Sequence, residues 1–259
     1  MSWQAAANFQ KYSAYYDLLY ADKDYEAEAG YVARVLRNAN PGVRTILELG
    51  SGTGRHGRLL AAMGLDVYGI ERSNEMAVIA QSTTDIVTVG GSFRCEVGDL
   101  RVVRLPRTFD AVISLFHVIS YQTTDDDLSA GFRTAATHLE KGGLFLFDVW
   151  HGPAVLATEP SIREKEAEKG RYRVKRVATP ERNAGAKTVK VVYALECEDR
   201  ESGERAQFQE EHVMRYLFPA EVDQFGSEAG FTLIGTEEFL TGRSPSEDTW
   251  GVAYLLRKE

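Results

Sequence analysis

The sequence predicts an α/β fold, in which a doubly wound seven-stranded sheet carries a small inserted antiparallel β-sheet. Three observations support this prediction. Up to residue 150, short apolar runs alternate with stretches of helical periodicity, which is typical of a parallel sheet covered by helices. The largely apolar run from Leu144 to Val149 shows no alternation of polar and apolar residues, as in a strand covered on both faces. Beyond Trp150, polar and apolar residues interleave, as in antiparallel strands with one face in water.

Glycine and proline mark where the expected elements of the core end. A helix over Asp24 to Asn38 has apolar residues at helical spacing and ends before Asn40-Pro41-Gly42. Gly64 is expected to end the next helix, and Lys141-Gly142-Gly143 a later one. In chain order, the other elements are a strand at Thr45–Leu49, a helix at Arg55–Met63, a strand at Asp66–Ile70, a helix at Ser73–Gln81, strands at Phe93–Val97 and Phe109–Leu115, a helix at Asp125–Leu139, a strand at Leu144–Val149, a helix at Pro219–Ala229, and strands at Phe231–Leu240 and Trp250–Leu256.

The stretch after Trp150 is interpreted as an insertion into this core. Its three expected strands are Arg171–Val177, Lys187–Glu198 and Arg205–Phe218, separated by turn-rich segments at Pro180–Gly185 and Glu201–Gly203. We therefore assign residues 1–150 and 218–259 to the core and residues 165–217 to the inserted sheet. An exposed edge of that sheet could pair two subunits, so a homodimer is expected.

Composition limits the classes of partner. The 259 residues carry a formal net charge of -8 and a pI near 5.3, which argues against binding to nucleic acid or an anionic membrane and favours a small molecule. No apolar run is long enough for a membrane span. Cys95 and Cys197 are too few for a disulfide framework, and the first residues lack an export signal, so a cytoplasmic location is expected. The scattered histidines have no metal-ligand spacing, and we expect no metal.

Residues Ile46 to Gly54 read I-L-E-L-G-S-G-T-G, an apolar strand that runs into a glycine-rich turn. Glycines at Gly50, Gly52 and Gly54 permit positive φ and let the backbone approach a ligand, and the helix that follows offers free N–H groups. This pattern predicts a nucleotide-binding turn. It leaves the nucleotide open, because Gly52, Gly54 and Gly57 also fit the G-x-G-x-x-G spacing of dinucleotide sites.

Glu71 does not decide between these alternatives, since it lies at a suitable distance from either choice of first glycine. Two other acidic residues, Glu48 and Asp99, do decide. Glu48 stands at the end of the strand, two residues before Gly50, and Asp99 ends a further apolar run in V-G-D-L. E-L-G-S-G-T-G resembles the first motif of the class I S-adenosylmethionine-dependent methyltransferases. The resemblance implies a Rossmann-like methyltransferase sheet, S-adenosyl-L-methionine as the cofactor, and Asp99 facing the adenine amino group.

The resemblance also implies roles for individual residues. Glu71 is expected to accept hydrogen bonds from both ribose hydroxyls, which a carboxylate does with its two oxygens. Glu48 is expected near the amino acid end of the cofactor, or beneath the loop as a brace. Arg72 is expected beside the adenine, with Asp99 and Leu100 at its edge and face. The complete set of expected cofactor-binding residues is Tyr16, Glu48, Gly50, Gly52, Gly54, Glu71, Arg72, Asp99, Leu100 and Leu115.

Tyrosines crowd the N-terminal region, where aromatic faces suit a sulfonium cation. They are Tyr12, Tyr15, Tyr16, Tyr20 and Tyr25. We expect four of them to pack the first helix onto the sheet, with Tyr16 as the exception.

A longer resemblance gives the reason. Y-Y-D-L-L-Y, the glycine motif, G-D-L, F-H-V-I-S-Y and the three-stranded insertion occur in the order found in the N-methyltransferases of nucleotide-linked amino sugars. It implies that Tyr16 and Tyr121 flank the amine of a small-molecule acceptor, such as a nucleotide-linked amino sugar. His117 is a further catalytic candidate because histidine can relay a proton, although a structural hydrogen bond explains it equally well.

Three residues are candidates for the acceptor pocket. Trp150 and His151 follow the fifth strand and could wall the pocket, and Arg243 could hold a phosphate or carboxylate. At both places the chain departs from the amino-sugar pattern, in F-D-V-W-H and in G-R-S-P-S. Methyl transfer is therefore better supported by the sequence than the identity of the sugar.

Two other functions remain open from the sequence. The chain could bind S-adenosylmethionine or S-adenosylhomocysteine without catalysis, since a fold alone does not establish an activity. It could also be an NAD(P)-dependent oxidoreductase, which would require tight binding of a reduced nicotinamide.

Overall fold

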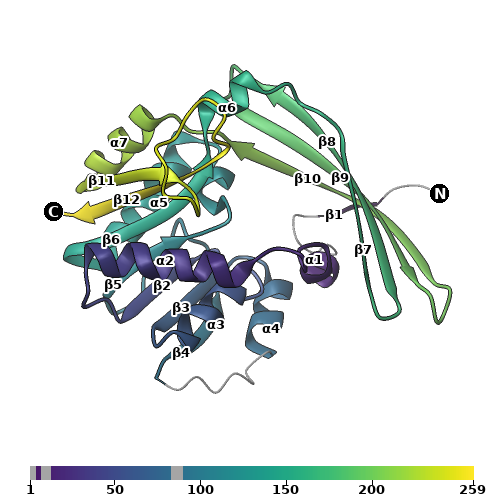
Figure 1. Ribbon diagram of the computed structural model, residues 1–259, viewed down its shortest axis with the longest axis horizontal. Helices are drawn as coiled ribbons and strands as arrows, with labels where there is room; N and C mark the ends of the chain where they lie inside the picture. The colour runs from purple at the N-terminus through teal and green to yellow at the C-terminus, as the bar shows by residue number, and fades with distance from the viewer. Residues whose placement is uncertain (1–3, 7–12, 83–89) are drawn as a thin grey trace. The chain divides into compact units, whose positions relative to one another are not determined.

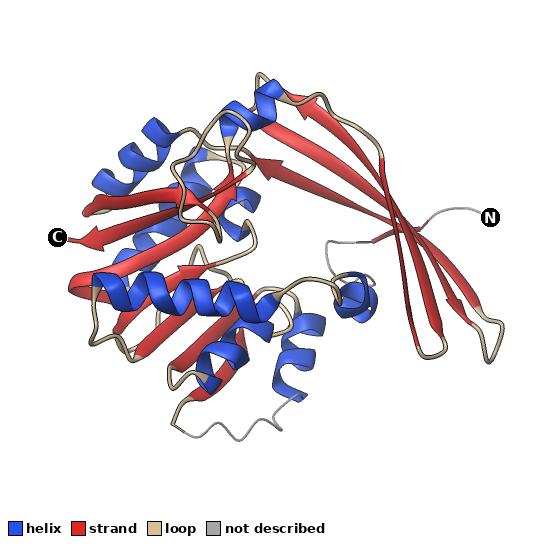
Figure 2. Cartoon of the chain, viewed as in Figure 1, coloured by secondary structure: helices blue, strands red, loops and turns tan. Residues whose placement is uncertain are grey.

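The protein was analysed as a computed structural model that describes residues 4–6, 13–82 and 90–259. The chain forms two compact units (Figures 1 and 2). One contains Glu159–Met214 together with the described residues up to Lys23, and the other contains Asp24–Thr158 and Arg215–Glu259. The sequence analysis assigns the residues before Asp24 to the core. In the structure they group with the inserted sheet, because their helix packs on it.

The larger unit is built on a seven-stranded sheet in the order β11-β12-β6-β5-β2-β3-β4. Its strands are β2 (Thr45–Leu49), β3 (Asp66–Glu71), β4 (Ser92–Val97), β5 (Phe109–Ser114), β6 (Leu139–Trp150), β11 (Phe231–Glu238) and β12 (Gly251–Lys258). Neighbours pair in parallel from β4 to β6, whereas β12 is antiparallel to both β6 and β11. The predicted doubly wound seven-stranded sheet is confirmed. Its strand order reverses at β2, next to β5.

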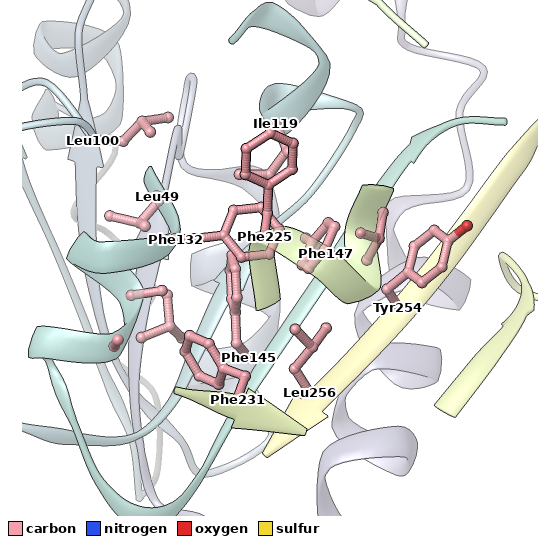
Figure 3. Packing of buried hydrophobic residues seen from close by; sticks show 14 of the residues in the cluster. Leu49, Leu100, Ile119, Phe132, Phe145, Phe147, Phe225, Phe231, Tyr254 and Leu256 are labelled. Atoms are coloured by element: carbon pink, nitrogen blue, oxygen red, sulfur yellow. The ribbon is translucent and has the colours of Figure 1, made fainter. Parts of the chain in front are cut away.

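Helices cover both faces of this sheet. They are α2 (Tyr25–Ala39), α3 (Arg55–Ala62), α4 (Asn74–Ser82), α5 (Asp125–Thr137), α6 (Gly152–Ala157) and α7 (Pro219–Glu228), with a 3-10 turn η1 at Val118–Tyr121. Phe145 and Phe147 of β6 lie in one buried cluster with residues of α5 and α7 (Figure 3). Leu144 and Leu146 lie in the opposite cluster with residues of α2. Both faces of β6 are therefore buried, which explains its continuous apolar run.

The smaller unit is the inserted sheet. Its long strands are β7 (Arg163–Lys169), β8 (Tyr172–Asn183), β9 (Thr188–Asp199) and β10 (Arg205–Arg215), and a short β1 (Gln4–Ala6) pairs in parallel with β10. Helix α1 (Ser13–Leu19) packs on this sheet through Leu19, which is buried with Val174, Leu195 and Phe208. Cys95 in β4 and Cys197 in β9 are buried free thiols, as expected of ordinary strand residues.

Two features of the inserted sheet differ from the sequence expectation. Pro180 was expected in a turn but lies within β8, opposite Val191 of β9. The pairing of β8 with β7 stops at Ala178, so at Pro180 one side of β8 has no partner strand in this sheet, an edge position at which proline is tolerated. Strand β7 was not predicted, because six of its seven residues are charged and its stability comes from pairing with β8.

Two features of the core also differ. Lys141-Gly142-Gly143 was expected to end a helix, but α5 already ends at Thr137 and these residues lie inside β6. His138, which follows α5, has its Nδ1 2.7 Å from the Thr134 carbonyl and so caps the helix early. Helix α6 was not predicted.

In the part of the chain that the structure describes, no helix has the length and apolarity needed to cross a membrane.

Candidate active site

The glycine loop lies between β2 and α3, at the end of the sheet where the strand order reverses. Gly50, Gly52 and Gly54 have φ of 80°, 55° and 76°, in the left-handed region that favours glycine. A Cβ on Gly50 would lie 2.5 Å from Val118, and one on Gly54 would lie 2.6 Å from the ring of Phe93. At Gly52 the nearest atom would be a methionine sulfur at 4.0 Å. Gly50 and Gly54 are thus needed for packing, whereas Gly52 has open space above it.

Glu71 ends β3 beside this loop. Its Oε2 accepts the backbone N–H of Gly52 at 2.8 Å, and its Oε1 accepts that of Ser73 at 2.7 Å. Burial raises the pKa of the Glu71 carboxyl, and these backbone donors oppose the rise. Each oxygen of a carboxylate can accept two hydrogen bonds. Glu71 can therefore hold the loop and still accept hydrogen bonds from the two hydroxyls of a ribose.

Glu48 lies in a different environment, although it is on the adjacent strand. The side chain is buried, and its Oε2 has no hydrogen-bond partner among the residues that the structure describes. A Cβ on Gly57 would lie 2.8 Å from this oxygen, which places the carboxyl against the first turn of α3. Burial raises the pKa of Glu48 to about 8, opposed by the positive charge of Arg58. This position beneath the loop suits a brace better than direct contact with the cofactor.

The adenine end of the expected site contains an ion-pair cluster. Arg101 donates to both oxygens of Asp99 and also to Asp127, at 2.9 Å. The hydrogen bonds from Arg101 hold the pKa of the Asp99 carboxyl below its usual range. Arg72 is largely exposed, with its Nε 4.0 Å from Asp99. Sequence reasoning missed Arg101, and no motif marks it; only the spacing of two residues from Asp99 could have suggested the pair.

Two of the other expected cofactor residues are leucines that lie within the hydrophobic core. Leu100 is packed in the cluster shared with α5, where a Cβ on Gly131 would lie 3.0 Å from its side chain (Figure 3). Leu115, just past β5, is buried in the cluster shared with α2. Only their backbones or the rims of their side chains are placed to meet a ligand.

The segment after β5 contains unusual backbone. Phe116 and His117 both have φ of 62°, a conformation that is uncommon for residues other than glycine and rare for bulky ones. His117 Nδ1 lies 2.7 Å from Oδ2 of Asp148, which also accepts the His117 backbone N–H at 3.2 Å. Asp148 is 1% exposed and lies in β6. Sequence reasoning named His117 and missed Asp148, although an aspartate within the apolar run F-L-F-D-V was a signal.

Tyr121 and Trp150 lie at the same edge of the sheet as this histidine. Tyr121 is half-buried at the end of η1, the turn that follows His117. The ring of Trp150, at the end of β6, lies 6.2 Å from the His117 ring and 5.7 Å from that of Trp250, both edge to face. Ser120 in η1 accepts the Trp150 backbone N–H at 3.2 Å. The structure thus brings Tyr121, His117 and Trp150 into one region.

His151 and Arg243 are less directly placed for substrate. His151 is buried, its pKa is lowered by burial, and its Nδ1 has no hydrogen-bond partner within the described residues. Arg243 is exposed and forms an ion pair with Glu238 at 2.7 Å. A phosphate could recruit Arg243 only in competition with that carboxylate.

The N-terminal tyrosines divide between the two units. Tyr16 lies in the smaller unit, on α1, with its ring 4.7 Å from that of Tyr20, and Tyr15 packs beside Phe208. Tyr25 lies in the larger unit, where its ring contacts His56 at 5.0 Å. The expectation that most of these tyrosines pack a helix onto a sheet holds for Tyr15 and Tyr20, although the sheet is the inserted one. Tyr16, expected to be the exception, packs against the same cluster. Tyr12 lies outside the described residues.

The residues at the switch point suit an adenosine-containing cofactor. Gly52 has open space where a side chain would stand, and Glu71 beside it presents carboxylate oxygens. Among the described residues, no group of three or more histidine, cysteine or acidic side chains could hold a metal ion.

Comparison with known proteins identifies the family. Residues 46–143 match the family described as methyltransferase domain. The chain is 31% identical over 230 residues to the dTDP-3-amino-3,4,6-trideoxy-alpha-D-glucopyranose N,N-dimethyltransferase of Streptomyces venezuelae, covering 88% of this chain and 91% of that protein. Neither this family nor this relative supports the oxidoreductase alternative.

Solved structures give the same result. The structure of DesVI from Streptomyces venezuelae superposes with a TM-score of 0.81 at 25% identity, over 96% of this chain and 98% of that one. The sugar N-methyltransferase KedS8 from Streptoalloteichus gives 0.78 at 26% identity, over 94% and 93%. The chain therefore belongs to the class I S-adenosylmethionine-dependent methyltransferases and is similar, over nearly its whole length, to the N-methyltransferases of nucleotide-linked amino sugars.

Proposed function

We propose that this protein methylates the amino group of a nucleotide-linked amino sugar. The observation that carries the proposal is the 31% identity over 88% of the chain to an enzyme named for that reaction. A second relative, from Streptomyces fradiae, is 29% identical over 71% of this chain and is named as an N,N-dimethyltransferase of a dTDP-linked 3-amino-3,6-dideoxy sugar. The shared element of these names is an amine on a dTDP-linked deoxysugar.

The proposed roles follow from the chemistry of the reaction. S-adenosylmethionine, when bound, supplies a methyl group already activated by a sulfonium. The remaining task of the protein is to align the acceptor amine and exclude water, and alignment of reactants can supply about 7 to 11 kcal/mol of a barrier. Glu71 and the loop at Gly52 would orient the nucleoside through their oxygens and N–H groups. Asp99, held by Arg101, would define the adenine edge.

The acceptor amine must reach the methyl group without a proton on its lone pair. Tyr16 and Tyr121 are proposed to flank the amine and accept hydrogen bonds from it, which orients the lone pair away from them. Trp150 and His151 would wall the acceptor pocket. Arg243 would exchange its partner Glu238 for a phosphate of the nucleotide, since a guanidinium binds phosphate oxygens in two places.

The proposal is tested with a panel of dTDP-linked sugars. Purified protein and S-adenosylmethionine are incubated with 3-amino and 4-amino deoxysugars, and the products are analysed by mass spectrometry. We expect one or two methyl groups on an amino sugar, none on the matched 3-hydroxy sugar, and a large loss of rate when the nucleotide is removed. Transfer to the hydroxy sugar, or binding of S-adenosylhomocysteine with no turnover on any amine, would refute the proposal.

Two further properties are part of this proposal. A cytoplasmic location agrees with the two buried free thiols. A homodimer that pairs through an edge of the inserted sheet is not expected to use β7, where lysine or glutamate occupies five of the seven positions. Such charges discourage pairing of edge strands. Sedimentation at working concentration would give twice the chain mass for the dimer.

A further inference from the structure

His117 and Asp148 form a pair to which the roles proposed above, in aligning cofactor and acceptor, assign no part. His117 follows β5 and Asp148 lies in β6, and the two residues meet at the carboxyl ends of these neighbouring parallel strands. Ligands of doubly wound sheets bind at these ends. The histidine side chain is 21% exposed and the aspartate 1% exposed. One end of the pair therefore reaches the site, and the other is anchored in the core.

The contact between the two side chains bears on which nitrogen of His117 carries hydrogen. Nδ1 of His117 is 2.7 Å from Oδ2 of Asp148, a close contact without the alignment of a hydrogen bond. A carboxylate oxygen at that distance favours hydrogen rather than a lone pair on Nδ1. The same Oδ2 accepts the backbone N–H of His117, which holds the carboxylate against the Nδ1 side of the ring. This arrangement favours the tautomer with hydrogen on Nδ1 and a lone pair on Nε2.

The orientation of the ring is also constrained. Trp150 stands edge to face with it, and a Cβ on Gly251 of β12 would lie 3.5 Å from Cε1 of His117. The backbone of Phe116 and His117 is left-handed, a conformation that is costly for residues other than glycine and persists only where the surroundings enforce it. The fold thus holds this imidazole in a costly position at the reaction edge.

We infer that His117 Nε2 accepts the proton released by the acceptor amine, and that Asp148 is a positioning residue that keeps His117 in the required tautomer. This inference rests on the proposed amine methylation. The amine nitrogen forms a bond to the methyl carbon while the carbon–sulfur bond breaks and leaves its electron pair on sulfur. The resulting N-methylammonium carries an excess proton, which passes to Nε2 and then to water.

The groups that face the pair are negative or neutral. Asp148 comes from β6, and Tyr121 lies in η1 on the same segment as His117. Tyr31 of α2 donates its hydroxyl to Glu237 of β11 at 2.6 Å, and its pKa is raised by burial, by Glu237 and in smaller part by Asp148. Tyr31 therefore stays neutral, and no cation among these groups competes for the histidine.

The first test needs neither cofactor nor acceptor. Nitrogen NMR of the histidines in the ligand-free protein reports which ring nitrogen carries hydrogen when the imidazole is neutral. We expect His117 to be protonated on Nδ1 in the wild type and on Nε2 in Asp148→Asn, because the amide would donate to Nδ1. The matched substitution in another carboxylate–histidine pair, Glu28→Gln beside His56, should leave the His117 signal unchanged. A wild-type His117 protonated on Nε2 would overturn the inference.

The second test measures turnover. His117→Asn is the suitable variant because asparagine tolerates the left-handed backbone. We expect kcat to fall on the order of a hundredfold, with S-adenosylhomocysteine affinity retained. Asp148→Asn should lower kcat similarly, and the double variant should be no slower than the slower single one, because the two act as a unit.

The outcomes separate the two proposals. Multiplicative losses in the double variant, or a His117→Asn enzyme with the wild-type rate and pH profile, would overturn the proton transfer while leaving the function intact. A wild type that methylates no amine would overturn the proposed function, and the tautomer in the ligand-free protein would still decide the pairing.

Discussion

Glu48 is a carboxylic acid at the end of β2 that has almost no contact with water. Burial raises its pKa to about 8, whereas an unfolded chain leaves glutamate near about 4.3. Between these values the folded state keeps a proton that the unfolded state has released. The free energy of unfolding should therefore be highest below the unfolded pKa, fall as the pH rises through the window, and level off above the folded pKa.

Glu48→Gln should remove this pH dependence, because glutamine has nearly the same shape and does not ionise. Urea denaturation of both proteins at about pH 5 and about pH 8 measures the effect. We expect the variant to gain stability relative to the wild type as the pH rises. Parallel pH profiles for the two proteins would show that Glu48 titrates normally in the folded state.

At the residue scale, the sequence predicted the side chains that a motif marks and missed their partners. Glu71, Asp99 and His117 stand out by their positions after strands. Arg101 and Asp148 do not, since their roles depend on side chains that lie far apart in the sequence or on the exact turn geometry. A single sequence shows which residues stand at a fixed place in a known motif. It does not show the side-chain contact that sets the ionisation state of such a residue.

The glycine loop shows how one element serves both folding and binding. Gly52 and Gly54 are both left-handed, but an added Cβ would meet ordinary contact at the first and the Phe93 ring at the second. Gly52→Ala should cost about 1 to 2 kcal/mol of stability, from backbone strain alone. It should weaken S-adenosylhomocysteine binding at least tenfold, because the methyl group would occupy the open space.

Gly54→Ala is the matched variant, in which the loss of stability should be large and the loss of S-adenosylhomocysteine affinity small. Strain and the collision with Phe93 should together cost several kcal/mol of stability. Calorimetric titration with S-adenosylhomocysteine and thermal unfolding measure the two properties. Equal effects of the two substitutions on affinity and on stability would contradict the division of roles in this loop.

At the element scale, the strands of the core were predicted most closely because their apolar runs reflect burial on both faces. The bounds of β2 agree at both ends, and β3, β4 and β5 differ by one residue at a single end. β7 could not be predicted, because its glutamates and lysines pair with charges on β8, such as Lys175 with Glu164. A strand that is held by ion pairs and ladder hydrogen bonds has no hydrophobic period to detect.

Tyr16 and Tyr121 are the two tyrosines proposed to flank the acceptor amine. Kinetics of Tyr16→Phe, Tyr121→Phe and the double variant test whether they act on one amine. We expect each single change to lower kcat/KM about tenfold and the losses in the double variant to depart from multiplicativity, as for residues that share a ligand.

Multiplicative losses would mean that the two hydroxyls act independently, and unchanged turnover in the double variant would remove both assigned roles. S-adenosylhomocysteine affinity serves as the control for Tyr121→Phe, because Tyr121 is not among the expected cofactor-binding residues.

At the scale of the whole molecule, the order of elements could be read from the sequence, including the insertion. The grouping of the N-terminal residues with the inserted sheet could not, because α1 is recognisable only by what it packs against.

The central claim is that the methyl group ends on the nitrogen of a nucleotide-linked amino sugar. The most direct measurement is NMR of the product formed from a dTDP-linked 3-amino deoxysugar and S-adenosylmethionine with an isotope-labelled methyl group. This account predicts a labelled methyl carbon bonded to the amino nitrogen, and no such signal when Glu71→Ala replaces the wild type. A labelled methyl on a ring oxygen or on carbon, or no labelled product from any amino sugar, would contradict it.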